Sequence, residues 1–296
     1  MKIANIILKG EQICVVNTQE GLIPAYQLAE HPGSRRHPSV ADVVADPPYL
    51  SILRSSLDRK NGKYDTIEES SALFSSPLGT PEKILCIGLN YRNHALETKK
   101  QIPDTPTVFS KFNNSIAAHN QDIVIPDSTG QLDYEGELGI MIGRTARKVS
   151  IESSMDYVFG FFVGNDVSAR DLQYRTTQWL LGKTSDGFFP AGPFITTEDE
   201  IADPNDLKIV TKLNGEVRQN SSTSNMIFRC DYLISYLSQY MTLRPGDVIS
   251  TGTPEGVILG MPPEKRKWIK NGDVVEVEIE NLGTLRNKFV SSAWFR

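Results

Sequence analysis

The chain lacks the features that mark several common classes of protein. Its three cysteines, Cys14, Cys86 and Cys230, lie far apart without a C-x-x-C pair or metal-type spacing, which argues against a disulfide scaffold or a zinc site. No window approaches the roughly 18 apolar residues of a membrane span. The net charge of −5 offers no basic surface to nucleic acid or to an anionic membrane. We therefore expect a cytoplasmic protein that acts on a small molecule and keeps its cysteines in the core.

The N-terminal part is expected to be rich in β-structure. Residues 3–8 and 12–16 have the composition of strands, and residues 9–11 between them are typical of a hairpin turn. Residues 49–57 have helical spacing.

A segment with proline and glycine divides the chain. Residues 75–81 contain two prolines and one glycine within five positions, which cannot continue a helix or a central strand. We therefore predict a small N-terminal β-rich domain over residues 1–78 and a larger domain over residues 79–296, long enough to bury a sizeable core.

The larger domain is expected to be of the α+β class with strands dominating. Short apolar runs bounded by glycine predict strands, and helical periodicity is clear in only two segments. This pattern differs from the regular alternation of strands and helices that builds a parallel sheet. The predicted strands cover residues 84–87, 158–163, 207–213, 248–250 and 274–279, and the predicted helices cover residues 153–157 and 231–241.

The most informative feature is a pair of carboxylates in an apolar stretch. Glu135 and Glu137 belong to the sequence LDYEGELGIMIG, whose second half is apolar enough for a core strand. Side chains two residues apart on a strand point to the same face, and adjacent like charges repel unless a cation lies between them. Oxygen-only ligation favours magnesium or calcium, with manganese as a further candidate. The alternative is an edge strand with two solvated glutamates.

A third acidic residue follows another apolar strand. Asp166 is expected at the end of the strand 158–163, with a helical turn behind it. Arg170 and Gln173, four and seven residues later, share its face on a helix and can meet one bound anion. The alternative is an ordinary capped helix in which Arg170 forms a surface ion pair.

Two further segments suit an anionic partner. Lys183 is the single cation of an apolar, glycine-rich stretch, and a buried lysine needs an anion to keep its proton. Residues 250–256 form a turn whose hydroxyls and backbone amides can bind a carboxylate. For Lys183, the alternative is a surface lysine whose aliphatic stem is buried. For residues 250–256, the alternative is an ordinary turn without a ligand.

A histidine and a glutamate form a possible acid/base unit. His94 and Glu97 are three residues apart and therefore adjacent on a helical turn. The carboxylate would fix the imidazole tautomer and raise its basicity, leaving the other ring nitrogen to take a proton from water. A surface ion pair is the alternative. Residues 93–103 have few apolar anchors, so we expect a mobile lid there.

Seven short motifs follow one another along the larger domain. They are GLNYxxHxxE from residue 88, VFSK ending at Lys111, LDYEGEL from 132, NDVSARDLQ from 165, GK(x)8GP from 182, LNGE from 213 and TGTPEGV from 251. In this order they closely resemble the fumarylacetoacetate hydrolase family, from about residue 84 to the C terminus. The chain is most similar to the smaller acylpyruvase-like branch, extended by an N-terminal lobe. Residues 184–193 depart from the pattern of many close relatives, which leaves the site for the distal end of the substrate open.

The resemblance implies a fold, a cofactor and a set of site residues. The fold is a mixed β-roll built around a distorted barrel, in a homodimer that binds magnesium or manganese. The implied metal ligands are Glu135, Glu137 and Asp166. The implied substrate-binding residues are Lys111, Arg170, Gln173 and Thr253, and the implied catalytic residues are His94, Glu97 and Lys183.

The implied reaction is metal-dependent cleavage of a C–C bond in a 2-oxo acid. An acylpyruvate or related diketo acid would be hydrolysed through an enolate that the metal stabilises. The same intermediate serves oxaloacetate decarboxylation or tautomerisation, and dienedioate isomerisation or decarboxylation in aromatic catabolism, and the sequence does not choose among these. A non-catalytic sensor of a metabolite is a further alternative, although a pure binding module has no use for a water-activating pair such as His94 and Glu97.

Overall fold

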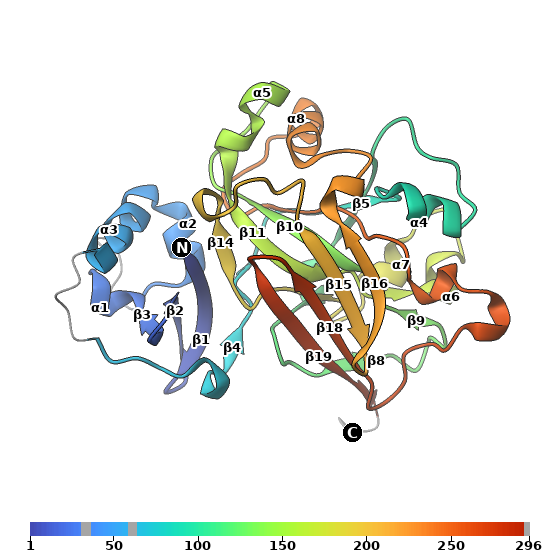
Figure 1. The fold of residues 1–296 in the computed structure, drawn as a ribbon, viewed down its shortest axis with the longest axis horizontal. Coiled ribbons are helices and arrows are strands. Elements are labelled where there is room, and N and C mark those ends of the chain that lie inside the picture. The colour runs from blue at the N-terminus through green and yellow to red at the C-terminus, as the bar shows by residue number, and fades with distance from the viewer. Residues whose placement is uncertain (31–36, 59–63, 293–296) are drawn as a thin grey trace.

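Two β-sheets form the framework of the protein, as Figure 1 shows for a computed structural model that describes residues 1–30, 37–58 and 64–292. The larger sheet has ten strands. In order across the sheet they are β3 (Gly21–Pro24), β2 (Glu11–Thr18), β1 (Lys2–Leu8), β14 (Ile195–Thr197), β11 (Val158–Asn165), β10 (Gly136–Ile142), β17 (Val248–Ser250), β5 (Ile84–Gly88) and β6 (Thr107–Lys111), with β4 (Phe74–Ser75) also paired to β1.

A five-stranded sheet packs against one face of β10 and β11 (Figure 1). Its order is β16 (Glu216–Ser222), β15 (Lys208–Leu213), β18 (Val274–Ile279), β19 (Gly283–Ser291) and β8 (Ile123–Ile125). Two short pairs, β9 (Leu132–Asp133) with β12 (Ser168–Ala169) and β7 (Ile116–Ala117) with β13 (Phe189–Pro190), complete the described strands. The predicted strands and the α+β class are thus confirmed, and the pairings among the described residues form open sheets, not a closed barrel.

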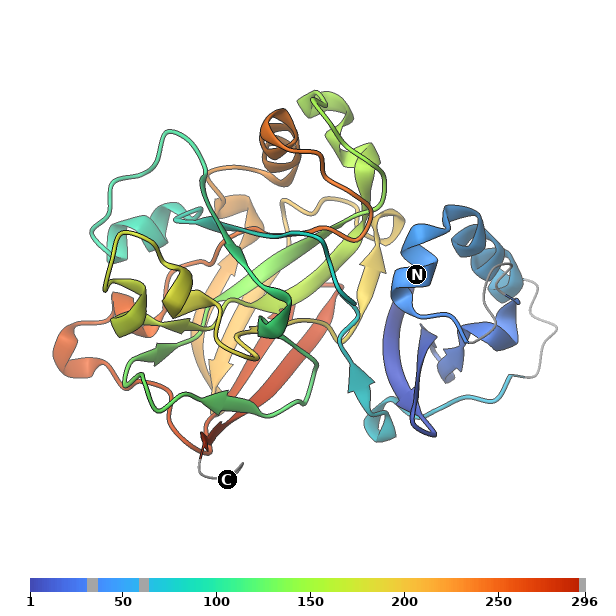
Figure 2. The same ribbon diagram turned by 180° about the vertical axis from the view of Figure 1, so that it is seen from behind.

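The helices are short and lie around the sheets, as the view from behind in Figure 2 shows. They are α1 (Ala25–Leu28), α2 (Val40–Ala45), α3 (Pro47–Asp58), α4 (Arg92–Glu97), α5 (Ile151–Ser154), α6 (Arg170–Gln173), α7 (Leu180–Lys183) and α8 (Cys230–Tyr240). The predicted helix at 49–57 lies within α3, 231–241 matches α8, and 153–157 spans α5 and a 3-10 turn. Within the described ranges, no helix has the length and hydropathy needed to cross a bilayer.

The alternation of side chains along β10 separates the core from the site. Leu138, Ile140 and Ile142 belong to the apolar cluster beneath the five-stranded sheet. Glu137 directly precedes Leu138 and therefore points to the opposite face. Gly136 faces the five-stranded sheet, and a Cβ there would lie 2.2 Å from Oγ1 of Thr211. The close approach of the two sheets thus requires glycine beside Glu137.

The N-terminal lobe continues the larger sheet. Lys2 of β1 pairs with Thr196 of β14, and one apolar cluster includes Tyr49 from the lobe together with Phe159 and Phe162 from β11. Sheet and core therefore run from one lobe into the other, and the domain boundary at residue 78 stays a prediction. The three cysteines are buried and free, as expected.

Candidate metal centre and active site

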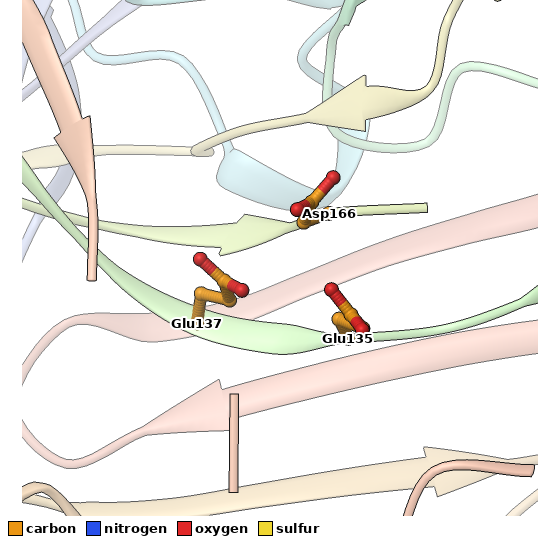
Figure 3. A group of neighbouring side chains, drawn as sticks. All are labelled: Glu135, Glu137 and Asp166. Carbon is orange, nitrogen blue, oxygen red and sulfur yellow. The ribbon is translucent and has the colours of Figure 1, made fainter. Parts of the chain in front are cut away.

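Three carboxylates meet where β10 and β11 pair. Glu135 precedes β10, Glu137 lies within it, and Asp166 follows the end of β11. The amide of Asp166 donates to the carbonyl of Glu135 over 2.9 Å, which fixes the two segments side by side. All three side chains are buried, and one carboxylate oxygen from each lies within 4.8 Å of the others. Figure 3 shows the three groups gathered around a shared space, so the interpretation of Glu135 and Glu137 as solvated edge residues is wrong.

Two buried lysines balance part of this negative charge. Nζ of Lys183 lies 2.6 Å from Oε2 of Glu135 and 2.8 Å from Oδ2 of Asp166. Nζ of Lys111 donates to Oδ1 of Asp166. Burial lowers the pKa of Lys183, but the charges of Asp166 and Glu135 outweigh burial and raise this pKa above its ordinary value. Lys183 therefore has the anionic partners that its sequence context required, and it is not a surface lysine.

Arg170 connects Glu135 to a fourth buried carboxylate, Asp133. Nη2 of Arg170 lies 2.7 Å from Oε1 of Glu135 and 2.9 Å from Oδ2 of Asp133. The amides of Ile258 and Leu259 also donate to Asp133, over 2.9 and 3.0 Å. Sequence reasoning missed Asp133. The available signal was its position two residues before Glu135, which continues the same alternating pattern.

Glu137 is held by neutral donors. Its Oε2 accepts hydrogen bonds from Oγ of Ser250 and from the amide of Gly252. No lysine or arginine in the described part of the chain forms an ion pair with it. Burial and the nearby charges of Asp166 and Glu135 raise the pKa of Glu137 well above its ordinary value.

This donor set fits a divalent cation. Four buried acidic side chains face three buried basic ones, which leaves one formal negative charge in a site closed to solvent. That set comprises Asp133, Glu135, Glu137 and Asp166 on the acidic side and Lys111, Arg170 and Lys183 on the basic side. Oxygen donors alone suit magnesium, manganese or calcium. A cation bound by Glu135, Glu137 and Asp166 would supply the positive charge that Glu137 lacks.

The turn after β17 binds a carboxylate, but the carboxylate belongs to the protein itself. Gly252 has φ +99°, and a Cβ there would lie 2.9 Å from the carbonyl oxygen of Ile87, so only glycine brings this amide to Glu137 without strain. Oγ1 of Thr253 donates to the carbonyl of Gly136 and accepts from Nε2 of Gln219, over 2.9 and 2.8 Å. Gln219 comes from β16 of the other sheet and had no local sequence signal.

Helices α6 and α7 pack closely and carry three predicted site residues, Arg170 and Gln173 on α6 and Lys183 on α7. Oε1 of Gln173 accepts from Nη1 of Arg170 over 3.0 Å, so the pair shares one face as expected. The N-cap of α6 is Ala169, without a side-chain cap, and Arg170 is buried. The alternative of a capped helix with a surface arginine is therefore wrong. Gly182 permits the contact with α7, because a Cβ there would lie 2.5 Å from the backbone nitrogen of Gln173.

His94 and Glu97 form a buried pair on α4. Nδ1 of His94 lies 2.9 Å from Oε1 of Glu97, whose Oε2 accepts from the amide of Gly256 over 3.0 Å. His94 is 6% exposed, which excludes a surface ion pair. The contact through Nδ1 leaves Nε2 as the nitrogen available for proton transfer.

A narrow cavity of about 30 Å³ joins these groups. Its lining includes polar side chains, among them Glu135, Glu137, Arg170, Lys183 and His94, and apolar residues, among them Gly88, Phe109, Trp179 and Leu259. This volume holds about two water molecules. Admission of a keto acid therefore requires lining residues to move, and the lid expected over residues 93–103 includes three of them, His94, Thr98 and Lys100. The mobility of that lid stays a prediction.

Comparisons with known proteins give one consistent family. A model described as "Fumarylacetoacetate (FAA) hydrolase C-terminal" matches residues 83–290. A mitochondrial oxaloacetate tautomerase of Rattus norvegicus is 43% identical over 242 residues, covering 81% of this chain and 76% of that protein. The structure of fumarylacetoacetate hydrolase from Exiguobacterium antarcticum has a TM-score of 0.81 at 33% identity, covering 98% of this chain and 99% of that one. The structure of 5-carboxymethyl-2-hydroxymuconate delta-isomerase from Mycobacterium smegmatis has a TM-score of 0.75 at 31% identity, covering 99% and 100%.

Proposed function

Because this chain belongs to the fumarylacetoacetate hydrolase family, we propose that it is a metal-dependent enzyme that interconverts the keto and enol forms of oxaloacetate or a similar 2-oxo acid. The observation that carries this proposal is the buried triad of Glu135, Glu137 and Asp166, with Lys183 and Arg170 beside it. The similarity to the rat tautomerase favours a reaction that the sequence alone gave only as an alternative.

A divalent cation is the implied cofactor. We propose magnesium, with manganese or calcium as alternatives, held by Glu135, Glu137 and Asp166. When bound, it would supply Lewis-acid polarisation of the 2-oxo group, worth several kcal/mol.

The basic residues of the cavity would orient the substrate and stabilise its negative charge. Arg170 and Lys183 are fixed by ion pairs to Glu135, so their charges are in place before substrate binds. Preorganised donors of this kind contribute about 3 to 4 kcal/mol to transition-state stabilisation. Lys111, Gln173 and Thr253 line or support the same space and are proposed as further substrate-binding residues.

His94 would carry the proton. In the proposed tautomerisation, Nε2 of His94 takes a proton from C3 of the keto form, and the electron pair of that C–H bond becomes the C2–C3 double bond. The electrons of the C2=O π bond move to the C2 oxygen, which takes a proton from water, and the charged imidazole returns its proton to the hydroxide that remains, so atoms and charge balance. Glu97 holds the imidazole in place through Nδ1. General-base catalysis of this kind contributes about 100- to 10,000-fold.

Hydrolysis of an acylpyruvate is the second candidate. The same His94–Glu97 pair is suited to deprotonate a water molecule that attacks the distal carbonyl, after which the C3–C4 bond breaks to give pyruvate and a carboxylic acid. The structural similarity to the hydrolase from Exiguobacterium antarcticum supports this candidate. Oxaloacetate decarboxylation and dienedioate isomerisation use the same enolate chemistry and belong in the same test.

A substrate panel decides among these reactions. The purified chain with magnesium would be given enol oxaloacetate, acylpyruvates and dienedioates, and the loss of enol absorbance and the release of pyruvate and carbon dioxide would be followed, with EDTA-treated protein as the control. We expect fast, metal-dependent loss of the oxaloacetate enol without pyruvate. Pyruvate release from acylpyruvates alone would replace tautomerisation by hydrolysis. If none of these compounds reacts, the result would favour a non-catalytic sensor.

We propose a homodimer in the cytoplasm as the working state of the chain. The rat relative is named as mitochondrial, so a location inside that organelle is the alternative where the source cell has one. Light scattering of the pure protein tests the dimer, and cell fractionation tests the location.

A further inference from the structure

A second, larger cavity adjoins the proposed active site. It has a volume of about 510 Å³ and lies between the end of α4, the residue after α6, and the segment 259–266. Figures 1 and 2 both place these three segments side by side. We call it the outer pocket; it is lined by Glu97, Thr98, Lys99, Lys100, Tyr174, Leu259, Gly260, Met261, Pro262, Pro263 and Arg266.

The outer pocket continues the narrow cavity of the active site. Thr98, Lys100, Tyr174 and Leu259 line both spaces. A substrate whose 2-oxo acid head lies against Arg170 therefore has a path along which its distal end reaches the outer pocket. The narrow cavity is too small for a longer molecule, whereas the outer pocket is not.

The charge of the outer pocket is positive. Three of its lining residues are cations: Lys99, Lys100 and Arg266. Its one acidic residue, Glu97, already has both oxygens engaged, by His94 and by the amide of Gly256. A small anion entering this space therefore meets unbalanced positive charge.

Two of the cations contact neutral groups of the protein and not an acidic partner. Nε of Arg266 donates to the carbonyl of Met261 over 2.9 Å, and Nζ of Lys100 lies 5.6 Å from the ring centroid of Tyr174. Ion pairs within the described ranges involve neither of these two residues. Their charges are consequently available to a ligand.

We propose that Lys100 and Arg266 bind a second, distal carboxylate of the substrate, so that the enzyme selects 2-oxo dicarboxylic acids over 2-oxo monocarboxylic acids. Lys100 lies at the junction of the two cavities and serves a short diacid such as oxaloacetate. Arg266 serves a diacid with a longer chain, whose methylene groups would lie on Met261 and Pro262. This proposal rests on the proposed function and names the substrate class of the same site.

The kinetic test compares each diacid with its distal monoester. The substrates are oxaloacetate and its 4-ethyl ester, and an acylpyruvate with a terminal carboxylate and the matching terminal methyl ester. The variants are Lys100→Met, Arg266→Met and the double variant, with Lys270→Met as the control, because Lys270 is exposed and outside the pocket. We expect Lys100→Met to lower kcat/KM for oxaloacetate about 10- to 100-fold, mainly through KM, and to change the value for the ester less than about threefold.

The outcome for the ester decides the assignment. If Lys100→Met lowers kcat/KM equally for the diacid and for the ester, the proposed role of Lys100 in binding the distal carboxylate is overturned. The proposed reaction would then still stand. A parent protein that prefers the esters would overturn it as well.

Calorimetry tests binding of the distal carboxylate independently of whether the enzyme turns over a substrate. The probes are N-oxalylglycine, an unreactive 2-oxo diacid mimic, and its glycine methyl ester, titrated into the magnesium-loaded protein. We expect the parent to bind the diacid at least about 10-fold more tightly than the ester, and the double variant to bind both equally. If no substrate turns over but this preference holds, the proposed function fails and the subsite stands. Equal affinity of the parent for both probes overturns the subsite.

Discussion

Nζ of Lys183 lies 2.6 Å from Oε2 of Glu135, and both side chains are buried in the wall of the narrow cavity. The pair joins α7 to the start of β10, two segments that are 48 residues apart in sequence. Burial raises the pKa of Glu135, but the charges of Lys183 and Arg170 outweigh burial and hold this pKa below its ordinary value. Glu135 is therefore ionised, as its proposed role as a metal ligand requires.

Replacing Lys183 with methionine should cost both activity and stability. Loss of one partner from a buried ion pair destabilises a protein by about 3 to 5 kcal/mol, and the substrate would lose a fixed positive charge. We expect turnover of oxaloacetate to fall at least about 100-fold. Urea unfolding and initial rates would measure the two effects, with the exposed Lys208→Met as the control. A Lys183→Met variant with parental turnover would contradict the role of this lysine.

Replacing His94 with asparagine should remove proton transfer without disturbing metal binding. His94 lines the cavity but is not among the three carboxylates. Turnover should fall about 100- to 10,000-fold, while calorimetric affinity for magnesium stays within about twofold of the parent. Glu97→Gln should have a smaller effect in the same direction, because it leaves the imidazole present and alters the group that orients it. Parental turnover in His94→Asn would mean that another group is the base.

Replacing Gly182 with alanine should disturb the site through the backbone. The new Cβ would lie 2.5 Å from the backbone nitrogen of Gln173, so α6 and α7 must separate. We expect a loss of about 1 to 3 kcal/mol in the free energy of unfolding and a raised KM. Gly130→Ala is the matched control, since nothing lies within 4 Å of a Cβ there. Equal stability of the two variants would show that the helices do not pack as described.

His119 should make stability sensitive to acid. Its Nδ1 accepts from the amide of Arg286 over 3.1 Å, and burial together with the charge of Arg286 lowers its pKa from 6.5 to about 4. The folded protein therefore holds His119 neutral, and the unfolded chain binds its proton first as the pH falls. This contribution to stability is complete above about pH 6.5 and is lost between about pH 6.5 and pH 4.

Unfolding of a His119→Asn variant measures this contribution. Asparagine keeps an acceptor for Arg286 but does not titrate. When the pH falls from about 7.5 to about 5, the free energy of unfolding of the parent should decrease by about 1 to 2 kcal/mol more than that of the variant. If the free energy of unfolding decreases equally in both proteins, other groups cause the acid sensitivity.

The sequence predicted the residues of the candidate metal site because their signals are local. Glu135 and Glu137 are two residues apart, and strand periodicity alone places them on one face. Lys183 was recognisable because its neighbours are too apolar for a solvated charge. His94 and Glu97 were found by helical spacing, and the structure joins them through a hydrogen bond.

The features that sequence reasoning missed depend on long-range packing. Gln219 reaches Thr253 only because the five-stranded sheet lies against β10, and no pattern near Gln219 reports that contact. The turn at 250–256 was correctly interpreted as a carboxylate binder, but only the fold shows that the carboxylate is Glu137. The outer pocket depends equally on three segments that are distant in sequence.

Manganese binding to the parent and to Glu137→Gln tests the central claim most directly. Electron paramagnetic resonance of Mn²⁺ titrated into each protein counts the bound ions and needs no substrate. We predict one tightly bound Mn²⁺ per chain in the parent, displaced by excess magnesium, and at least about 100-fold weaker binding in the variant, which keeps the side-chain volume but lacks the charge. A parent chain that binds no Mn²⁺ at saturating concentration, or a Glu137→Gln variant that binds it equally well, would contradict the account.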